Sequence, residues 1–285
     1  MERSTGASAQ RVSATPPASP PLLAVTAWPR NSSIALVLRG EAFRDRKVAQ
    51  GFTPIHIVHG KRSNDRPGTC ANSTAPRQLA QGQSLLRHVI RPLEERKNRV
   101  DLFVSEGSGS CKLVSSLLEI WGSSRVVETD IVRRSHSQYE GLRRALDLVQ
   151  PVRHAYALVL VARFDLTWKR SITTTEADVS KFNFLSRCEL SAPDRGAHPC
   201  VHDAFFMFPG AGDGRFFSAI SEALGGRSCF NPNSPVLFIR PGLEGGHWCS
   251  QPLREALGNE SLGFLTSWRP QKRVTELDHP VAVIE

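Results

Sequence analysis

The sequence predicts an α/β protein with a three-layer α/β/α arrangement and a mostly parallel central sheet, mixed at the edge. Apolar runs alternate with amphipathic segments along the chain, and most of these runs are continuous rather than alternating with polar residues. Continuous apolar runs are typical of strands buried on both faces, and regular alternation of strands with helices is typical of parallel sheets. Together these patterns favour a sheet covered by helices on both faces.

Six short apolar runs are predicted strands. The first, at 34–38, is bounded by Asn31 and Gly40. The most apolar run, at 156–162, is the predicted central strand and ends abruptly in Arg163-Phe-Asp165. The other predicted strands are 100–104, 125–131, 204–208 and 236–239.

Segments with apolar residues at helical spacing separate the strands. The clearest is 135–149, where Ser135 or Ser137 can cap the helix and Leu142 and Leu146 share one face. The other predicted helices are 84–97, in which Pro92 predicts a kink or early end, 111–121, 213–224 and 250–257. Residues 60–78 have the composition of a loop.

Composition divides the chain into two parts. Residues 1–32 are rich in Ser, Thr, Ala and Pro, which predicts a flexible tail or stem, and residues 33–285 predict a single domain. With 40% hydrophobic and 22% charged residues, the chain as a whole is globular in composition. No run reaches the roughly 18 apolar residues expected of a membrane-spanning helix.

The net charge of +9 favours an anionic partner. The sequence contains neither GxxxxGK[ST] nor GxGxxG, which disfavours a P-loop enzyme and a dinucleotide-dependent oxidoreductase. Nucleic-acid binding is an alternative that the basic composition suggests, but the arginines are spread along the chain rather than gathered on one element.

Cysteines and glycosylation sequons bear on the compartment. Six cysteines, an even number without a CxxC pair, and sequons at Asn31, Asn72 and Asn259 favour the Golgi or secretory lumen over the cytoplasm. Among the disulfide connectivities that remain open, Cys188 with Cys200 and Cys229 with Cys249 are the pairs we expect first.

Polar residues follow two of the predicted strands, where ligands of parallel sheets bind. After the first strand, Gly40 lets a ligand approach the backbone, and Arg39 and Arg44 can donate to a phosphate. After the central strand, Asp165 is placed to hold a divalent cation beside a diphosphate. Arg163 can neutralise the charge of this carboxylate or bind the phosphate directly. The alternative is a purely structural arginine–aspartate pair.

Two further residues are candidates at the ends of elements. Asp203 directly precedes the strand at 204–208 and could ligate a metal, orient an acceptor hydroxyl, act as a base or only cap a turn. His247 follows two glycines and could reach back to a metal–phosphate centre, or simply pack.

A third group alternates at His198, Cys200 and His202, as zinc ligands on an extended segment would. Three ligands at a period of two fit one tetrahedral ion poorly, and the sequence shows no matching second cluster. A disulfide at Cys200 is therefore the preferred interpretation.

The chain resembles a group of glycosyltransferase-like proteins of eukaryotic microbes, which look like divergent members of the GT-A (nucleotide-diphospho-sugar transferase) superfamily. The likeness covers roughly residues 33–270. It rests on IALVLRGEAFR at 34–44, Ser137-Gln138, YALVLVARFDLTW at 156–168 and HDAFFMFP at 202–209. The resemblance implies a Rossmann-like α/β/α domain that binds a nucleotide sugar and transfers the sugar to a glycan or protein acceptor.

The resemblance also implies roles for individual residues. Arg163-Phe-Asp165 would stand in place of the family's Asp-x-Asp metal motif, and because Arg163 replaces its first acid, dependence on Mn²⁺ or Mg²⁺ is in doubt. The implied roles are metal binding for Asp165 and His247, catalysis for Asp165 and Asp203, and nucleotide-sugar binding for Arg39, Gly40, Arg44, Gln138, Arg163 and Asp165. The missing acid also supports the alternative of a catalytically inactive nucleotide-sugar-binding domain.

Overall fold

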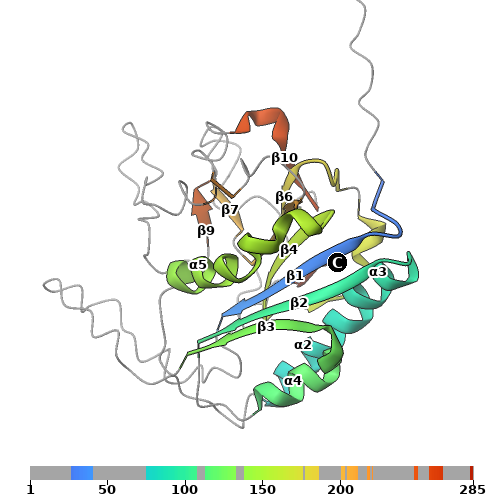
Figure 1. Ribbon diagram of the computed structural model, residues 1–285, viewed down its shortest axis with the longest axis vertical. Coiled ribbons are helices and arrows are strands. Elements are labelled where there is room, and N and C mark those ends of the chain that lie inside the picture. The colour runs from blue at the N-terminus through green and yellow to red at the C-terminus, as the bar shows by residue number, and fades with distance from the viewer. Residues whose placement is uncertain are drawn as a thin grey trace, which may run out of the picture.

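A seven-stranded sheet forms the centre of the fold (Figure 1). Its strands are β1 (Ser33–Gly40), β2 (Arg99–Glu106), β3 (Val126–Ile131), β4 (Leu158–Arg163), β6 (Phe182–Phe184), β8 (Phe205–Pro209) and β10 (Leu262–Phe264). They lie in the order β10-β6-β8-β4-β1-β2-β3, so β4 is central, as the sequence predicts.

The computed structural model describes most of the sheet and of the helices that cover it. The described residues are 27–40, 75–107, 113–132, 138–175, 177–185, 200–202, 204–210, 217, 218, 220, 247–249, 257–265 and 283–284. The predicted strand at 236–239 lies outside them, as do most of the predicted helices at 213–224 and 250–257 and the expected caps Ser135 and Ser137.

The sheet is mostly parallel, which confirms the predicted fold class. β1 pairs in parallel with both β2 and β4, β2 with β3, and β6 with β10. β8 alone in this sheet runs antiparallel to its neighbours β4 and β6. This reversed strand lies inside the sheet, between β6 and β4, rather than at the edge where we expected the mixed pairing.

Two small pairs of strands complete the described sheets. β5 (Thr167–Trp168) pairs in parallel with β11 (Val283–Ile284), and β7 (Cys200–His202) pairs antiparallel with β9 (His247–Cys249). No strand is predicted from the sequence between residues 162 and 204, yet β6 lies there. Three-residue strands such as β6 and β10 are too short to show a periodic pattern.

Helices cover both faces of the sheet (Figure 1). On one side lies α5 (Gln138–Val149); on the other lie α2 (Ala75–Leu85), the π-helix η3 (Leu86–Ile90), α3 (Arg91–Glu95) and α4 (Val114–Trp121). The short 3₁₀ helices are η4 (Ser123–Arg125), η5 (Gln150–Ala155), η6 (Ile172–Thr174) and η8 (Asn259–Ser261). No helix within the described residues is long and apolar enough to cross a membrane.

The alternation of side chains along the central strands creates two separate cores. Even-numbered residues such as Leu36 pack into the core shared with α2, α3 and α4, whereas odd-numbered residues such as Val37 and Val161 pack against α5. All three side chains are completely buried. Strands buried on both faces must be apolar throughout, which is why their runs are continuous in the sequence.

The helix before β2 differs from the prediction at its start and at Pro92. It begins at Ala75, so residues 75–78 are helical and the loop expected there is wrong. Pro92 does not end the helix, which continues from η3 into α3, and it stands in the first turn of α3. The preceding π-turn, in which the Arg91 N–H donates to the carbonyl of Leu86, shifts the hydrogen-bond register there.

The core extends beyond Ser33 into the segment that we expected to be a tail. Trp28 is buried, its indole N–H lies 3.5 Å from the carbonyl oxygen of Thr175, and its own carbonyl accepts a hydrogen bond from Arg96. Residues 27–32 therefore pack on the domain.

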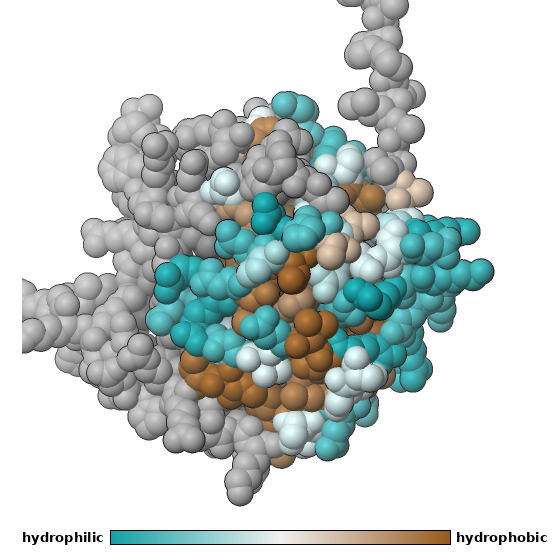
Figure 2. Space-filling model, in the orientation of Figure 1, coloured by the Kyte–Doolittle hydropathy of each residue, from teal (hydrophilic) through white to brown (hydrophobic). Residues whose placement is uncertain are grey.

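Edge strand β3 is the most exposed strand of the described sheet. Val127 is 55% exposed and Ile131 46%, and Figure 2 shows hydrophobic residues reaching this face of the molecule. Arg144 of α5 forms an ion pair with Asp130 of β3, which ties the helix to this edge.

Candidate functional site

The carboxyl ends of β2, β1 and β4 bring polar residues to one edge of the sheet. Arg39, near the end of β1, pairs in register with Arg163 of β4 on one side and with Ser105 of β2 on the other. Gly40 then pairs with Glu106. Three neighbouring parallel strands therefore end in this group, at the edge where parallel sheets bind ligands.

Arg39 and Arg163 lie on the α5 face of the sheet. Both have odd positions in the alternation that sends Val37 and Val161 toward α5. Arg39 is 2% exposed, whereas the side chain of Arg163 is 25% exposed. Two arginines paired across adjacent strands thus have their side chains on the same face of the sheet, one buried and one partly open to solvent.

Arg163 and Asp165 form a bidentate ion pair. The Arg163 Nε atom donates to Oδ1 of Asp165 at 2.9 Å and Nη2 donates to Oδ2 at 2.5 Å. Phe164, between them, is buried on the opposite side, where its ring stacks on that of Trp121 in α4. Burial of this middle residue leaves its two neighbours on the same side of the chain, where they meet.

The electrostatics of this pair keep Asp165 ionised. Burial of the carboxyl group by itself would raise its pKa, but the charge and hydrogen bonds of Arg163, together with the charge of Arg39, lower it below the usual value. The effect of Arg39 means that both arginines act on the same carboxylate.

Two glutamines of α2 fix the turn that carries Asp165. Gln78 donates from Nε2 to the carbonyl oxygen of Phe164 at 2.7 Å, and Gln81 donates to that of Asp165 at 3.1 Å. Both side chains are buried. The N–H of Arg163 also donates to the carbonyl of Ala204, just before β8, at 2.9 Å. The turn is therefore held from the helical layer and from the neighbouring strand.

Gly40 and Glu106 complete the edge on the side of α2 and α4. Gly40 has φ +120°, a backbone conformation that other residues rarely adopt, although the space around it would admit a Cβ atom. Its carbonyl accepts a hydrogen bond from the N–H of Gly107 at 2.9 Å. Glu106 is completely buried and lies directly opposite.

The structure thus brings together four of the predicted site residues: Arg39, Gly40, Arg163 and Asp165. Gln138 begins α5, seven positions after the end of β3 at this same edge, and His247 begins β9. Neither side chain lies within the described part. Arg44 and Asp203 also fall outside the described residues, so their predicted roles stay predictions.

Ser105, Glu106 and the two glutamines were not among the predicted site residues. Ser105 and Glu106 directly follow the predicted strand at 100–104, so the strand-end rule that selected Arg39 would also have selected them. No sequence pattern marks Gln78 and Gln81 as site residues, because the residues they contact, Phe164 and Asp165, lie more than eighty positions away.

The carboxylate of Asp165, as the structure shows it, does not fit a divalent cation. Both oxygens of Asp165 already accept hydrogen bonds from Arg163, and hard cations need several oxygen ligands. No group of three metal-ligating side chains occurs among those that the structure describes.

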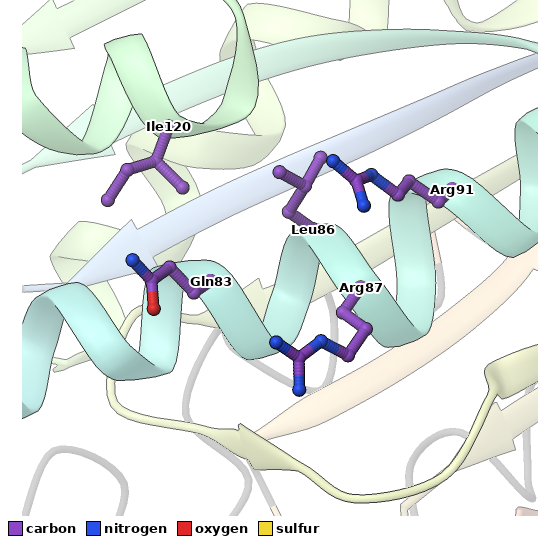
Figure 3. A pocket seen from close by; sticks show the side chains of 5 residues that line it. All are labelled: Gln83, Leu86, Arg87, Arg91 and Ile120. Carbon is purple, nitrogen blue, oxygen red and sulfur yellow. The ribbon is translucent and has the colours of Figure 1, made fainter.

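An open pocket of about 370 Å³ lies elsewhere, between the helices on the far side of the sheet (Figure 3). Figure 3 shows that the continuous helical stretch formed by α2, η3 and α3 supplies four of the lining side chains, and that α4 supplies Ile120. Its lining residues are Gln83, Leu86, Arg87, Arg91 and Ile120, none of which is a predicted site residue.

Comparisons with known proteins give only distant similarity. No protein-family model and no curated protein matches the chain. A protein assigned as a nucleotide-diphospho-sugar transferase from Desulfovibrio desulfuricans G20 is similar over 84% of this chain and 81% of its own, at 10% identity and a TM-score of 0.42. The nucleoside-diphosphate-sugar pyrophosphorylase from Vibrio cholerae RC9 is similar over 82% and 92%, at 12% identity and a TM-score of 0.41. Neither similarity assigns an activity to this chain, and the eukaryotic microbial type stays a prediction.

The glutamine contact predicts a loss of stability. Gln78→Ala removes the donor to the buried carbonyl of Phe164, which we expect to lower the free energy of unfolding by about 1–3 kcal/mol. Gln83→Ala, an exposed position on the same helix, is the matched control and should change it by less than about 0.5 kcal/mol. Urea unfolding measures both, and equal losses would contradict the positioning role of Gln78.

The Arg163–Asp165 pair predicts a pH-dependent effect. The pKa of Asp165 is lower in the folded chain than the ~3.9 of an unfolded aspartate, so its ionised form stabilises the fold above about pH 4, and this contribution is lost as the pH falls through the folded-state pKa. Asp165→Asn should therefore lower the melting temperature at neutral pH and have less effect in acid.

The expected change at neutral pH is no more than a few degrees, since the side chain of Asp165 is 40% exposed and water screens the pair. Asp147→Asn, at an exposed position of α5, is the control. A difference between wild type and Asp165→Asn that stays constant down to about pH 3 would contradict the assignment.

Proposed function

We propose that this chain binds the diphosphate of a nucleotide sugar at the carboxyl ends of β1 and β4 and transfers the sugar to a glycan or protein acceptor. The observation that carries the proposal is the register pairing of Arg39 with Arg163 at this edge, where the charges of both arginines lower the pKa of Asp165. Arg39, Arg163 and Asp165 together leave one positive charge on the α5 face of the edge, opposite the side of Glu106, and this charge suits a diphosphate.

The chemistry requires stabilisation of the leaving group. When the bond between the sugar and the diphosphate breaks, negative charge develops on the diphosphate oxygens, and fixed positive groups lower the barrier. Arg163 is already oriented by its two hydrogen bonds to Asp165, so little reorganisation is needed. The N-terminus of α5, whose partial charge is positive, begins at the same edge of the sheet.

The proposal gives Asp165 a positioning role. Its carboxylate holds the guanidinium of Arg163, so Asp165 would bind Mn²⁺ or Mg²⁺ only if that ion pair opened. We therefore propose that arginines provide most of the charge stabilisation, and activity in the presence of a chelator would support this.

Other predicted residues complete the proposed site. Asp203 stands next to Ala204, whose carbonyl is bonded to Arg163, and is proposed to orient the acceptor hydroxyl or accept its proton. Gln138 and Arg44 are proposed donor contacts. A secretory or Golgi location is also part of the proposal, and Asn31, an exposed sequon residue next to β1, is the site at which glycosylation can be tested.

A second candidate function is binding of a nucleotide sugar without transfer. The observation that favours it is the engagement of both Asp165 oxygens by Arg163, which leaves neither oxygen ready for metal or base chemistry. The two candidates predict the same ligand but differ in turnover.

Binding tests the diphosphate site. In titrations with a panel of UDP- and GDP-sugars, Arg39→Ala and Arg163→Lys should each weaken binding about ten-fold or more, because each removes a charge-assisted contact or its forked geometry. Arg87→Ala, an exposed arginine on the helical layer, is the matched control and should bind as wild type does. Equal affinity in all four proteins would contradict the site, and circular dichroism checks that Arg39→Ala is folded.

Turnover separates the two candidate functions. Release of nucleoside diphosphate from the sugar that binds best, measured with and without an acceptor mixture, should fall at least about ten-fold in Arg163→Lys if the chain is a transferase. Tight binding without measurable release, under conditions where the wild type is saturated, would support the binding domain instead.

A further inference from the structure

β7 and β9 form a two-stranded ribbon apart from the seven-stranded sheet. The antiparallel pairing sets Cys200 opposite Cys249 and His202 opposite His247. The two strands lie far apart in the sequence, so nothing but the fold brings these four residues into register.

The composition of the ribbon is unusual. Cysteine and histidine occupy four of its six positions, although the whole chain has only six cysteines and nine histidines among 285 residues. The rare residues also meet in like pairs, cysteine with cysteine and histidine with histidine. Coincidence is a poor explanation for such a match.

The pairing places the four residues on one face of the ribbon. Successive residues of a strand alternate between its faces, so Cys200 shares a face with His202, and His247 shares a face with Cys249. Directly paired residues lie on the same face of a sheet. The four Cα positions therefore mark a rectangle of about 5 Å by 7 Å.

We propose that Cys200, His202, His247 and Cys249 bind one zinc ion. Two thiolates and two imidazoles are a tetrahedral ligand set for structural zinc, with metal–ligand bonds of roughly 2.0–2.3 Å, and softer than the oxygen sets that magnesium and manganese prefer. An ion above the middle of a rectangle of this size is within reach of ligands from all four corners. β9 thus supplies the second cluster that the sequence did not reveal.

A disulfide between Cys200 and Cys249 competes with this proposal. Their pairing would suit it, and sequence analysis expected these two cysteines in other disulfides, with Cys188 and Cys229, which lie outside the described residues. A disulfide leaves the paired histidines unexplained, whereas zinc accounts for all four residues.

The proposed ion would act on the candidate site through the chain. His202 is separated by one residue from Ala204, whose carbonyl accepts a hydrogen bond from the N–H of Arg163, so the Cα atoms of His202 and Ala204 lie within about 8 Å of each other. Four protein ligands leave no open position, which makes the ion structural rather than catalytic. It would hold the chain in place where β8 begins.

The metal content of the full-length chain tests the proposal. Protein purified under reducing conditions without chelators is expected to carry about one zinc per chain. His202→Asn and His247→Asn should lose most of it, as should Cys249→Ser. The matched controls are His154→Asn, at an exposed position of η5, and Cys70→Ser, and both should keep it.

A titration of the metal-free wild type with Co²⁺ avoids variants that fail to fold. Tetrahedral cobalt with two thiolates is expected to give visible absorption bands and to be displaced by one equivalent of Zn²⁺, which would support the site. Absence of both zinc and cobalt binding would overturn the proposal, and so would zinc content that the histidine variants leave unchanged. A Cys200–Cys249 disulfide found by peptide mapping of unreduced protein would also overturn it. None of these results depends on nucleotide-sugar binding.

Discussion

The bidentate pair of Arg163 and Asp165 is the constraint on which the candidate site depends. It lies at the end of the central strand, where the chain leaves the sheet and has lost its regular hydrogen bonds. Buried Gln78 and Gln81 replace those bonds by donating to the carbonyls of the turn. Because a buried carbonyl without a donor is costly, the position of the pair is fixed by the helical layer as much as by the strand.

The ion pair also determines which charge the candidate site presents. An isolated carboxylate would attract cations, but Asp165 is neutralised by Arg163 and further influenced by Arg39. Arg39, Arg163 and Asp165 therefore leave one positive charge on the α5 face of the edge, in keeping with the basic composition of the chain. Phe164 makes this arrangement possible, since its burial against Trp121 leaves the arginine and the aspartate on one side of the turn.

The parts of the fold that could be predicted are those in which one local pattern determines the structure. The buried strands β1 and β4 have continuous apolar runs, and α5 has a single apolar face, so each was predicted close to its observed limits. Residues 75–78 gave no helical pattern because Gln78 is buried through hydrogen bonds rather than apolar contacts. The site was found in part, since strand ends can be read from the sequence, whereas the glutamines and the pairing of β7 with β9 depend on contacts between distant segments.

The reversed direction of β8 has a consequence for how this protein can diversify. β6 runs with β4 and finishes at the ligand edge, and β8, running the other way, starts there. The whole connection from residue 185 to residue 204 accordingly leaves and re-enters the sheet beside Arg163. Insertions or exchanges in the part of that connection that precedes β7 would act at this edge while the strands of the seven-stranded sheet keep their partners, so the candidate site and the sheet are open to change independently of each other.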